Sequence, residues 1–221
     1  MGLYLVDLYR SPNIGIFLKA NDKAVLVPKG IASTKAERLA ADLDVVACHT
    51  SVGGTRLLGP LIAMNNKGVV ASRMIEDYEM EEISSKTGLK VTRLESRFTA
   101  VGNLVAANDY GAIVSPVLER HAVFEVQAAL GVETVTMTIG EYSQVGAMVV
   151  ATNSGAAVSP RASEEEAHEI EKVLKVEASA SSVNGGIPYP ASGVVANTKN
   201  AVAGYLTTGP ELLFLTRALN V

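Results

Sequence analysis

The chain has 221 residues, of which 48% are apolar, a net charge of −4 at pH 7 and a single cysteine. A chain of this length can bury a substantial core. Its net negative charge argues against DNA or RNA binding through phosphates as the main role. A single cysteine excludes an internal disulfide framework. No window approaches the ~18 consecutive apolar residues of a membrane span, and the N-terminal stretch, interrupted by Asp7, lacks the apolar core of a signal peptide, so we expect an intracellular, cytoplasmic protein.

Five units of hairpin, helix and strand are predicted along the chain, and residues 102–139 show the pattern most clearly. Apolar runs on both sides of a turn at 108–111 predict a β-hairpin, because Asn, Asp and Gly accept the positive-φ geometries of tight turns. Pro116 stands where a helix could begin, the residues after it are apolar at helical spacing, and Gly131 ends the helix. In chain order, the predicted helices span 33–42, 75–86, 117–130, 163–174 and 210–219, and the strands after the first four span 44–51, 89–96, 132–139 and 176–183.

Three of these helices carry the spacing of a capping box at their start. In that arrangement a hydroxyl and a carboxylate each satisfy a backbone N–H that the helix leaves without a partner. The three pairs are Thr34 with Glu37, Ser163 with Glu166, and Thr208 with Glu211.

The first unit is preceded by an extra strand, and the last unit lacks one. Residues 3–9 (LYLVDLY) are predicted to form a strand with no helix before it, whereas the fifth helix has only Asn220 and Val221 after it. The simplest closure pairs the N-terminal strand with the last unit, which gives a closed ring without an end repeat that needs a polar cap.

The units are repeats of about 44 residues, marked by a small residue, then Asn six positions later, then Gly three positions after that. The first slot holds Gly15, Gly59, Gly102, Gly146 and Ala191; the second holds Asn21, Asn65, Asn108, Thr152 and Asn197; the third holds Ala24, Gly68, Gly111, Gly155 and Asn200. A unit of three strands and one helix is marginal alone. We therefore expect one α/β domain over residues 1–221, built from five α+β repeats.

The five equivalent turns are the best candidate for a binding surface, because turns on a rigid scaffold commonly form recognition sites. A closed ring brings them to a common side, with exposed amides and few charges. The candidate residues are Asn21, Asp22, Asn65, Asn66, Asn108, Asp109, Tyr110, Asn153 and Asn197, with Gly15, Gly59, Gly102 and Gly146 as structural turn glycines. The alternative is that Asn and Gly only satisfy the backbone geometry of the hairpins.

Other candidates for chemistry are weaker. Cys48 and His49 are adjacent on a strand and point to opposite faces, so His49 is badly placed to activate the thiol, and Cys48 is expected to pack as a small apolar group. No metal-ligand spacing and no phosphate-binding loop appears, and GGTRLLG is expected to have no helix behind it. A ligand in a central channel is expected to meet the irregular stretches 11–13, 51–54, 96–99, 142–144 and 182–186, beside Arg10, Arg56 and Arg97; the alternative is that these stretches only connect strands.

Several segments resemble one known family. AVGNLVAANDYGAIVSP is similar to the third repeat of the translation initiation factor 6 family, TTGPELL resembles the start of its last helix, and LGPLIAMNNKGVV and VGAMVVATNSGAAVSP fit in order and spacing. The likeness covers essentially the whole chain, and the end of the chain just after the fifth helix resembles the archaeal form. Ala191 and Asn200 depart from it by replacing expected glycines.

The resemblance implies a pentein fold, which is a five-bladed α/β propeller with pseudo-five-fold symmetry. It implies a monomeric factor that binds the intersubunit face of the large (50S) ribosomal subunit, chiefly through ribosomal protein uL14 with neighbouring proteins and ribosomal RNA, and that blocks joining of the small subunit and accompanies large-subunit maturation. It implies no reaction, no catalytic residue, no cofactor and no metal, and neither membrane nor DNA as a partner. The family's hairpin Asn matches Asn108 and its first-repeat Gly matches Gly15, and pseudo-symmetry extends the face to the other turns.

Two alternatives remain. Penteins include enzymes that modify guanidino groups with a Cys nucleophile, a His and carboxylates; here the thiol is in the first repeat and the last repeat contains no His. The other alternative is a ring-shaped scaffold for a different protein partner.

Overall fold

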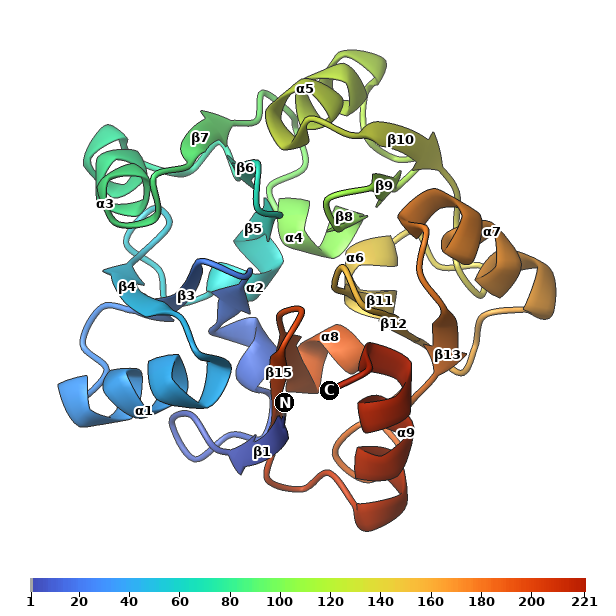
Figure 1. Cartoon of the computed structure of the whole chain (residues 1–221). Helices are drawn as coiled ribbons and strands as arrows, with labels where there is room; N and C mark the ends of the chain where they lie inside the picture. The colour runs from blue at the N-terminus through green and yellow to red at the C-terminus, as the bar shows by residue number, and fades with distance from the viewer. Residues whose placement is uncertain (1) are drawn as a thin grey trace.

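The computed structural model describes residues 2–221, and five similar units surround a common centre in it (Figure 1). The first repeat contains η1 (Ile14–Ile16), β2 (Lys19–Ala20), β3 (Ala24–Pro28), α1 (Ser33–Leu43) and β4 (Val46–Thr50); the second contains α2 (Leu58–Leu61), β5 (Ile62–Met64), β6 (Gly68–Ala71), α3 (Asp77–Thr87) and β7 (Lys90–Arg93). The third contains α4 (Val101–Leu104), β8 (Val105–Ala107), β9 (Gly111–Val114), α5 (Arg120–Leu130) and β10 (Glu133–Thr136); the fourth contains α6 (Val145–Met148), β11 (Val149–Ala151), β12 (Ala156–Val158), α7 (Glu164–Leu174) and β13 (Ala178–Ala180). The fifth contains α8 (Pro190–Gly193), β14 (Val194–Ala196), β15 (Asn200–Gly204) and α9 (Gly209–Leu219), and β1 (Gly2–Val6) precedes the first.

Each repeat forms a small three-stranded sheet with one antiparallel and one parallel pair. In the third repeat, β8 pairs antiparallel with β9 across the hairpin, and α5 then carries the chain to β10, which pairs parallel with β9. The middle strands are buried runs of small and β-branched residues, such as GAIV in β9. That composition suits a strand that is covered on both faces.

The fifth sheet is completed from the other end of the chain, in the order β1-β15-β14. β1 pairs parallel with β15, in a register from Gly2 opposite Asn200 to Val6 opposite Gly204. Strand β1 is shorter than the predicted strand at 3–9, because the chain turns at Tyr9 and Arg10, which both have positive φ.

The long helices lie on the outside of the five units (Figure 1). Their buried apolar side chains pack in clusters with those of the strands. Helix α5 buries Ala122, Val126 and Leu130, one residue per turn, which is the spacing that its sequence predicted. Each repeat contributes a cluster of buried apolar side chains, and neighbouring clusters share strands; Ile113 of β9, for example, packs in the cluster of the fourth repeat.

Several boundaries differ from the prediction. Helix α5 begins at Arg120 rather than just after Pro116, because Pro116 and Val117 form a turn and the buried Leu118 follows it. The outer strands are two or more residues shorter than predicted. The apolar runs that lead into the hairpins begin with a single helical turn, as in α4. Helix α2 is such a turn, and it begins at Leu58 near the end of GGTRLLG, where no helix was expected.

Two of the three predicted capping boxes are confirmed, at Ser163 with Glu166 and at Thr208 with Glu211. The box at Thr34 is wrong, because α1 starts at Ser33 with Ala32 as its N-cap, so Thr34 already lies inside the helix. A box that the sequence did not suggest forms at α3 between Glu76 and Glu79.

Candidate functional site

The Asn residues of the second slot hold the hairpin turns from inside. In the third repeat, Oδ1 of Asn108 accepts the backbone N–H groups of Tyr110 and Gly111 at 2.9 and 3.1 Å. The same pair of bonds forms at Asn21, Asn65 and Asn197. This is an Asx-turn. The predicted hairpin is confirmed, but none of these turn residues has positive φ, so the turn geometry expected from the sequence is wrong.

The other end of each amide joins one repeat to the next. Nδ2 of Asn108 donates to the carbonyl oxygens of Thr152 at 3.0 Å and Leu174 at 2.8 Å, which lie at the next turn and at the end of the next helix. Asn65 donates in the same way to Asn108 and Leu130, Asn21 to Asn65, and Asn197 to Leu43. The last of these bonds connects the fifth repeat to the first.

The fourth repeat makes the same connection with a different residue. Thr152 replaces Asn in the slot and holds its own turn through Oγ1, which accepts from Ser154 and Gly155. Its side chain is too short to reach the next repeat as well. Oγ of Ser154 donates instead to the carbonyl oxygens of Thr198 and Leu219, at 3.1 and 2.9 Å.

These contacts overturn the expectation that the slot residues are exposed amides. Asn21, Asn65, Asn108 and Asn197 are 6%, 4%, 3% and 3% exposed, respectively. Their donors and acceptors form hydrogen bonds inside the protein. Such bonds are expected, because a buried amide without partners would destabilise the fold. Replacing Asn108 would therefore disturb the fold before it reported on any partner.

The slot glycines likewise have a different role from the predicted one. Gly15, Gly59, Gly102 and Gly146 do not have positive φ, so they are not turn glycines. A Cβ on Gly59 would overlap the carbonyl oxygen of Gly15, and one on Gly102 would overlap that of Gly59. They are small because neighbouring repeats approach backbone to backbone. Despite Ala191 and Asn200, α8 and β15 still form in the fifth repeat.

The second residues of the turns meet on the axis of the ring. The backbone N–H of Asp22 donates to Asn66 Oδ1, that of Asn66 to Asp109 Oδ1, and that of Asp109 to Asn153 Oδ1, all at 2.8–2.9 Å. The N–H of Thr198 donates back to Asp22 at 2.7 Å. The carboxylates also accept side-chain amides, since Nδ2 of Asn66 lies 2.7 Å from both Asp22 and Asp109. This half-buried cluster is held by its own bonds.

The exposed surface of this side comes from the third residue of each turn, a position the sequence argument covered only at Tyr110. Tyr110 is 46% exposed. Lys23 and Lys67 occupy the same position, and their ammonium groups donate to the carbonyl oxygens of Asn66 and Asp109 in the next turn. Lys199 pairs with Asp44 at 2.7 Å, which raises the pKa of Lys199 and lowers that of Asp44. We call Lys23, Lys67, Tyr110, Ser154 and Lys199 the turn face. The turn face carries more charge than the sequence analysis expected. Alignment of the five repeats would have identified it, because its residues all occupy the same position of the repeat.

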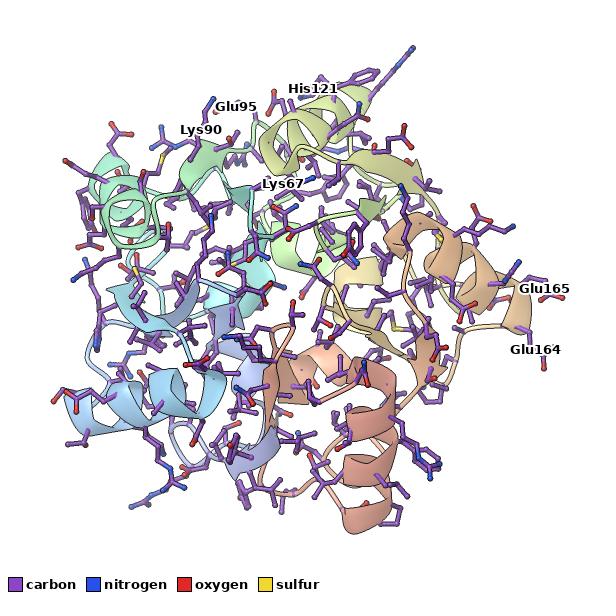
Figure 2. The ribbon with its side chains drawn as sticks, viewed as in Figure 1. Lys67, Lys90, Glu95, His121, Glu164 and Glu165 are labelled. Carbon is purple, nitrogen blue, oxygen red and sulfur yellow. The ribbon has the colours of Figure 1, made fainter. Side chains whose placement is uncertain are left out.

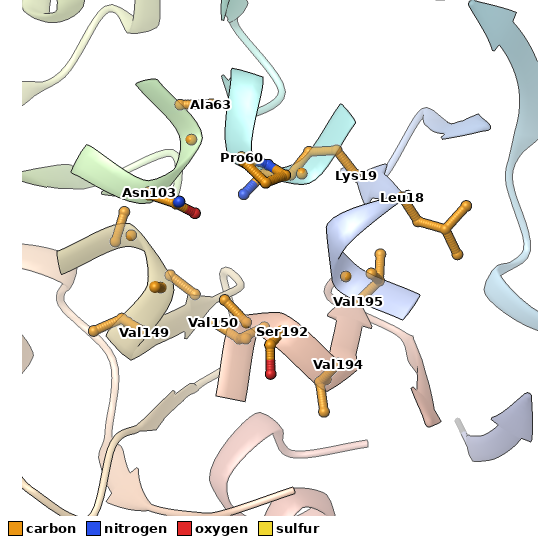
Figure 3. Close-up of a pocket in the computed structure, with 18 of the residues that line it drawn as sticks. Leu18, Lys19, Pro60, Ala63, Asn103, Val149, Val150, Ser192, Val194 and Val195 are labelled. Atoms are coloured by element: carbon orange, nitrogen blue, oxygen red, sulfur yellow. The ribbon is translucent and has the colours of Figure 1, made fainter. Parts of the chain in front are cut away.

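A cavity of about 290 Å³ lies on the same axis, next to the turn cluster. It is lined by the slot glycines and by the residues just after them, among them Lys19, Asn103 and Val195 (Figure 3). None of the irregular stretches at 11–13, 51–54, 96–99, 142–144 and 182–186 lines it, so their expected role in the channel is wrong.

Three of these stretches, 51–54, 96–99 and 182–186, are connections held by an acidic residue at or near the start of the following helix. Glu79 of α3 accepts from Ser51 Oγ and from the N–H groups of Gly53 and Gly54 at 2.6–3.0 Å. Burial raises the pKa of Glu79, but these hydrogen bonds and that from Glu76 outweigh it and lower the pKa. The arginines beside these stretches make local contacts: Arg56 stacks 5.1 Å from the Tyr9 ring, and Arg97 lies 3.5 Å from Glu119.

Cys48 is a buried thiol, as expected, rather than a nucleophile. It is fully buried in the apolar cluster of the second repeat, and Sγ lies 3.8 Å from the carbonyl oxygen of Glu82. Burial, together with the nearby Glu82 carboxylate, raises the pKa of Cys48 to about 11. The group therefore stays protonated near neutral pH, which removes the thiolate that nucleophilic attack requires. Its neighbour His49 is exposed on the other face of β4.

In the described part of the chain, residues 2–221, no helix has the length and apolar character needed to cross a bilayer.

Comparison with known proteins gives one consistent result. The model of the eIF-6 family matches residues 3–218. Translation initiation factor 6 of Cenarchaeum symbiosum is 46% identical over 218 residues, and so is that of Nitrosopumilus maritimus; each alignment covers 99% of both chains. Translation initiation factor 6 of Staphylothermus marinus is 33% identical over 223 residues, which cover 100% of this chain and 98% of the relative.

Proposed function

The chain belongs to the eIF-6 family, whose relatives are translation initiation factors, and from that premise we propose that it binds the large ribosomal subunit on its intersubunit face and prevents association with the small subunit. The observation that carries the proposal is the family match over residues 3–218. Function in the cytoplasm, on ribosomes and during large-subunit maturation follows from the same proposal.

We assign the five-fold arrangement to the pentein propeller and regard residues 1–221 as one monomeric domain. The sheet order β1-β15-β14 and the Asn197 bond to Leu43 support a closed ring, because both join the fifth repeat to the first. A closed ring is a rigid support. Rigid surfaces lose little conformational entropy when they bind.

The binding surface that we propose is the turn face, and the partner is chiefly ribosomal protein uL14, with neighbouring proteins and ribosomal RNA as further contacts. The hydrogen bonds of the turns support this assignment, because they give the turn residues different roles. Asn21, Asn65, Asn108 and Asn197 hold the face in shape, Asn66, Asp109 and Asn153 close its centre, and the third turn residues meet the partner. Three of these third residues are lysines, whose charge suits an acidic protein segment or RNA phosphates.

Tyr110 is the residue that we expect to contribute most to binding. Its ring is exposed, and exposed Tyr residues with rigid neighbours are frequent hot spots of interfaces. Its backbone N–H is already fixed by Asn108, so the side chain can be removed without loss of the turn.

The test compares Tyr110→Ala with Tyr205→Ala in binding to isolated large subunits. Tyr205 is similarly exposed, at 48% against 46%, but follows the other end of β15, away from the turns. We expect Tyr110→Ala to weaken binding by about 1–2 kcal/mol, which is roughly 5–30-fold, and to weaken the block on subunit joining in parallel. Tyr205→Ala should bind like the unmodified protein.

Cross-linking from position 110 should capture uL14. Glu165→Lys serves as a charge control, because Glu165 lies on the outer edge at α7 while Lys67 lies nearer the centre (Figure 2). If Tyr110→Ala binds normally and Tyr205→Ala or Glu165→Lys does not, the binding face is a different one. If the unmodified protein does not bind large subunits at all, the proposed function is wrong.

A further inference from the structure

The axial cavity is a pocket that ends at the turn cluster. Its volume of about 290 Å³ is near the lower end of the roughly 300–1,000 Å³ of small-molecule pockets. Toward the turns it gives way to a space of only about 30 Å³, which is lined by Asp22, Asn66, Asp109, Asn153 and Thr198. Hydrogen bonds across the axis hold those residues together, so a ligand in the cavity meets a closed floor.

Lys19 breaks the symmetry of this cavity. It stands four positions after Gly15, and the equivalent positions in the other repeats hold Ala63, Ala106, Val150 and Val195. One repeat therefore places an ammonium group where the other four place an apolar side chain. In Figure 3 the Lys19 side chain extends from β2 into the pocket, and the Asn103 amide points into it from α4 of the third repeat, with Pro60 between them.

The Lys19 ammonium has no anionic partner among residues 2–221. Burial alone lowers the pKa of Lys19, to about 8, with no nearby charge to oppose the shift. The only other titratable side chain that lines the cavity is Tyr189. Asp22 and Asp109 belong to the floor, and their oxygens accept amide and hydroxyl donors from the turn cluster. Lys19 is half-buried, so its ammonium keeps only part of its water, and an opposite charge in the cavity would offset that cost.

We propose that the axial cavity is a binding site for a small organic monoanion, a carboxylate with a short apolar body, which pairs with the Lys19 ammonium and hydrogen-bonds to the Asn103 amide. One positive charge matches one negative charge, so polyphosphates and nucleotides do not fit the electrostatics of the site. The walls of Ala, Val and Pro60 suit an apolar body. This site is separate from the turn face and does not depend on ribosome binding.

Hexanoate is a suitable probe, and hexanamide is its neutral counterpart of similar size. We expect NMR titration of the purified protein to show saturable binding of hexanoate with a dissociation constant in the millimolar range or below. The shifted amide signals should belong to residues that line the cavity, such as Gly59 and Gly102. Hexanamide should bind at least about tenfold more weakly, because it carries no negative charge to pair with the Lys19 ammonium. Affinity for hexanoate should fall as the pH rises above about 8, where the free ammonium deprotonates.

Two lysine variants make the test specific. Lys19→Met keeps the length of the side chain, restores the apolar pattern of the other repeats and should abolish the preference for hexanoate over hexanamide. Lys23→Met removes a lysine of the turn face four residues away and should leave hexanoate binding unchanged. Thermal melting of both variants checks that they are folded. Equal binding of the acid and the amide, undiminished hexanoate binding by folded Lys19→Met, or no saturable binding in the millimolar range would each overturn the proposal.

Discussion

At the scale of single residues, the Asn side chains of the turns each do two things at once. The oxygen of Asn108 holds its own hairpin, and the nitrogen holds the turn and the helix end of the next repeat. Both ends are needed, since a turn alone would accept Asp or Ser. The need for a donor on one side and an acceptor on the other explains why the repeat uses Asn in particular.

We therefore predict that Asn108→Asp strongly destabilises the protein, although the two side chains have the same shape. The carboxylate keeps the turn acceptor but faces the carbonyl oxygens of Thr152 and Leu174, so a buried charge is left beside two acceptors. The expected loss is about 2–4 kcal/mol of unfolding free energy. Chemical denaturation measures it.

The matched control is Asn220→Asp. Asn220 is exposed at the end of α9 with φ of 56°, a conformation that Asp also tolerates. It should change stability by less than about 0.5 kcal/mol. Equal stabilities of the two variants would show that the inter-repeat bonds of Asn108 matter little.

At the scale of elements, an acidic residue near the start of a helix ties that helix to the loop that enters its repeat. Glu211 of α9 accepts from Thr208 at the helix start and from Ser182, Gly185 and Gly186 in the loop, at 2.8–3.0 Å. Burial acts to raise the pKa of Glu211, but the hydrogen bonds outweigh it and lower the pKa to about 2. A loop without regular structure is thereby fixed by the helix that follows it.

This arrangement predicts a pH-dependent contribution to stability. Because the folded pKa of about 2 lies below the ordinary 4.5, the contribution is complete above about pH 4.5 and is lost as the pH falls toward 2. Glu211→Gln should lower the unfolding free energy by about 1–3 kcal/mol at pH 7, and its deficit should shrink below pH 4.5. Denaturation curves at a series of pH values measure both effects.

Glu164→Gln is the control for the element scale, since Glu164 is an exposed residue in the first turn of α7. It should stay close to the unmodified protein at every pH. A Glu211→Gln deficit that remains constant down to pH 2 would contradict the role given to the ionised carboxylate.

At the scale of the whole molecule, the two ends of the chain are joined in one sheet. In the other repeats the long helix is followed by a parallel strand, and in the fifth repeat β1 takes the place of that strand. Figure 1 shows the N- and C-termini close to this sheet. Asn197 and Leu43 connect the same two repeats at the axis. The first and fifth repeats are therefore in contact both through this sheet and at the axis.

Deleting residues 2–6 should therefore cost several kcal/mol, a large part of the roughly 5–15 kcal/mol that stabilises a typical domain. The loss comes from five pairing positions of β15 and from the apolar cover of the fifth sheet. Thermal melting of the deletion variant tests this. Leu5→Ser keeps the strand and changes one exposed side chain, so it should melt near the unmodified protein. A deletion variant that melts within a few degrees of the intact protein would show that β1 is dispensable.

The sequence by itself determined the period, the order of hairpin, helix and strand in each repeat, the extra strand at the start of the chain, and the family. These features depend on local hydrophobic patterns and on residues near one another in the chain, which a sequence displays directly. Cys48 was also interpreted correctly, because a lone thiol without a suitably placed base has a simple packing role.

Only the tertiary structure decided what the repeated residues do. The Asn and Gly slots were predicted from turn chemistry, but Asn108 and Gly59 are required by carbonyl oxygens of neighbouring repeats. Every residue has a backbone carbonyl oxygen, so the sequence does not show which of these oxygens a neighbouring repeat will contact. Lys19 is a similar case, because its position matters only once the five repeats enclose a cavity around it. The residues concerned are 40 or more positions apart in the chain, and the backbone atoms that they approach, like the cavity, come together only when the repeats have packed against one another.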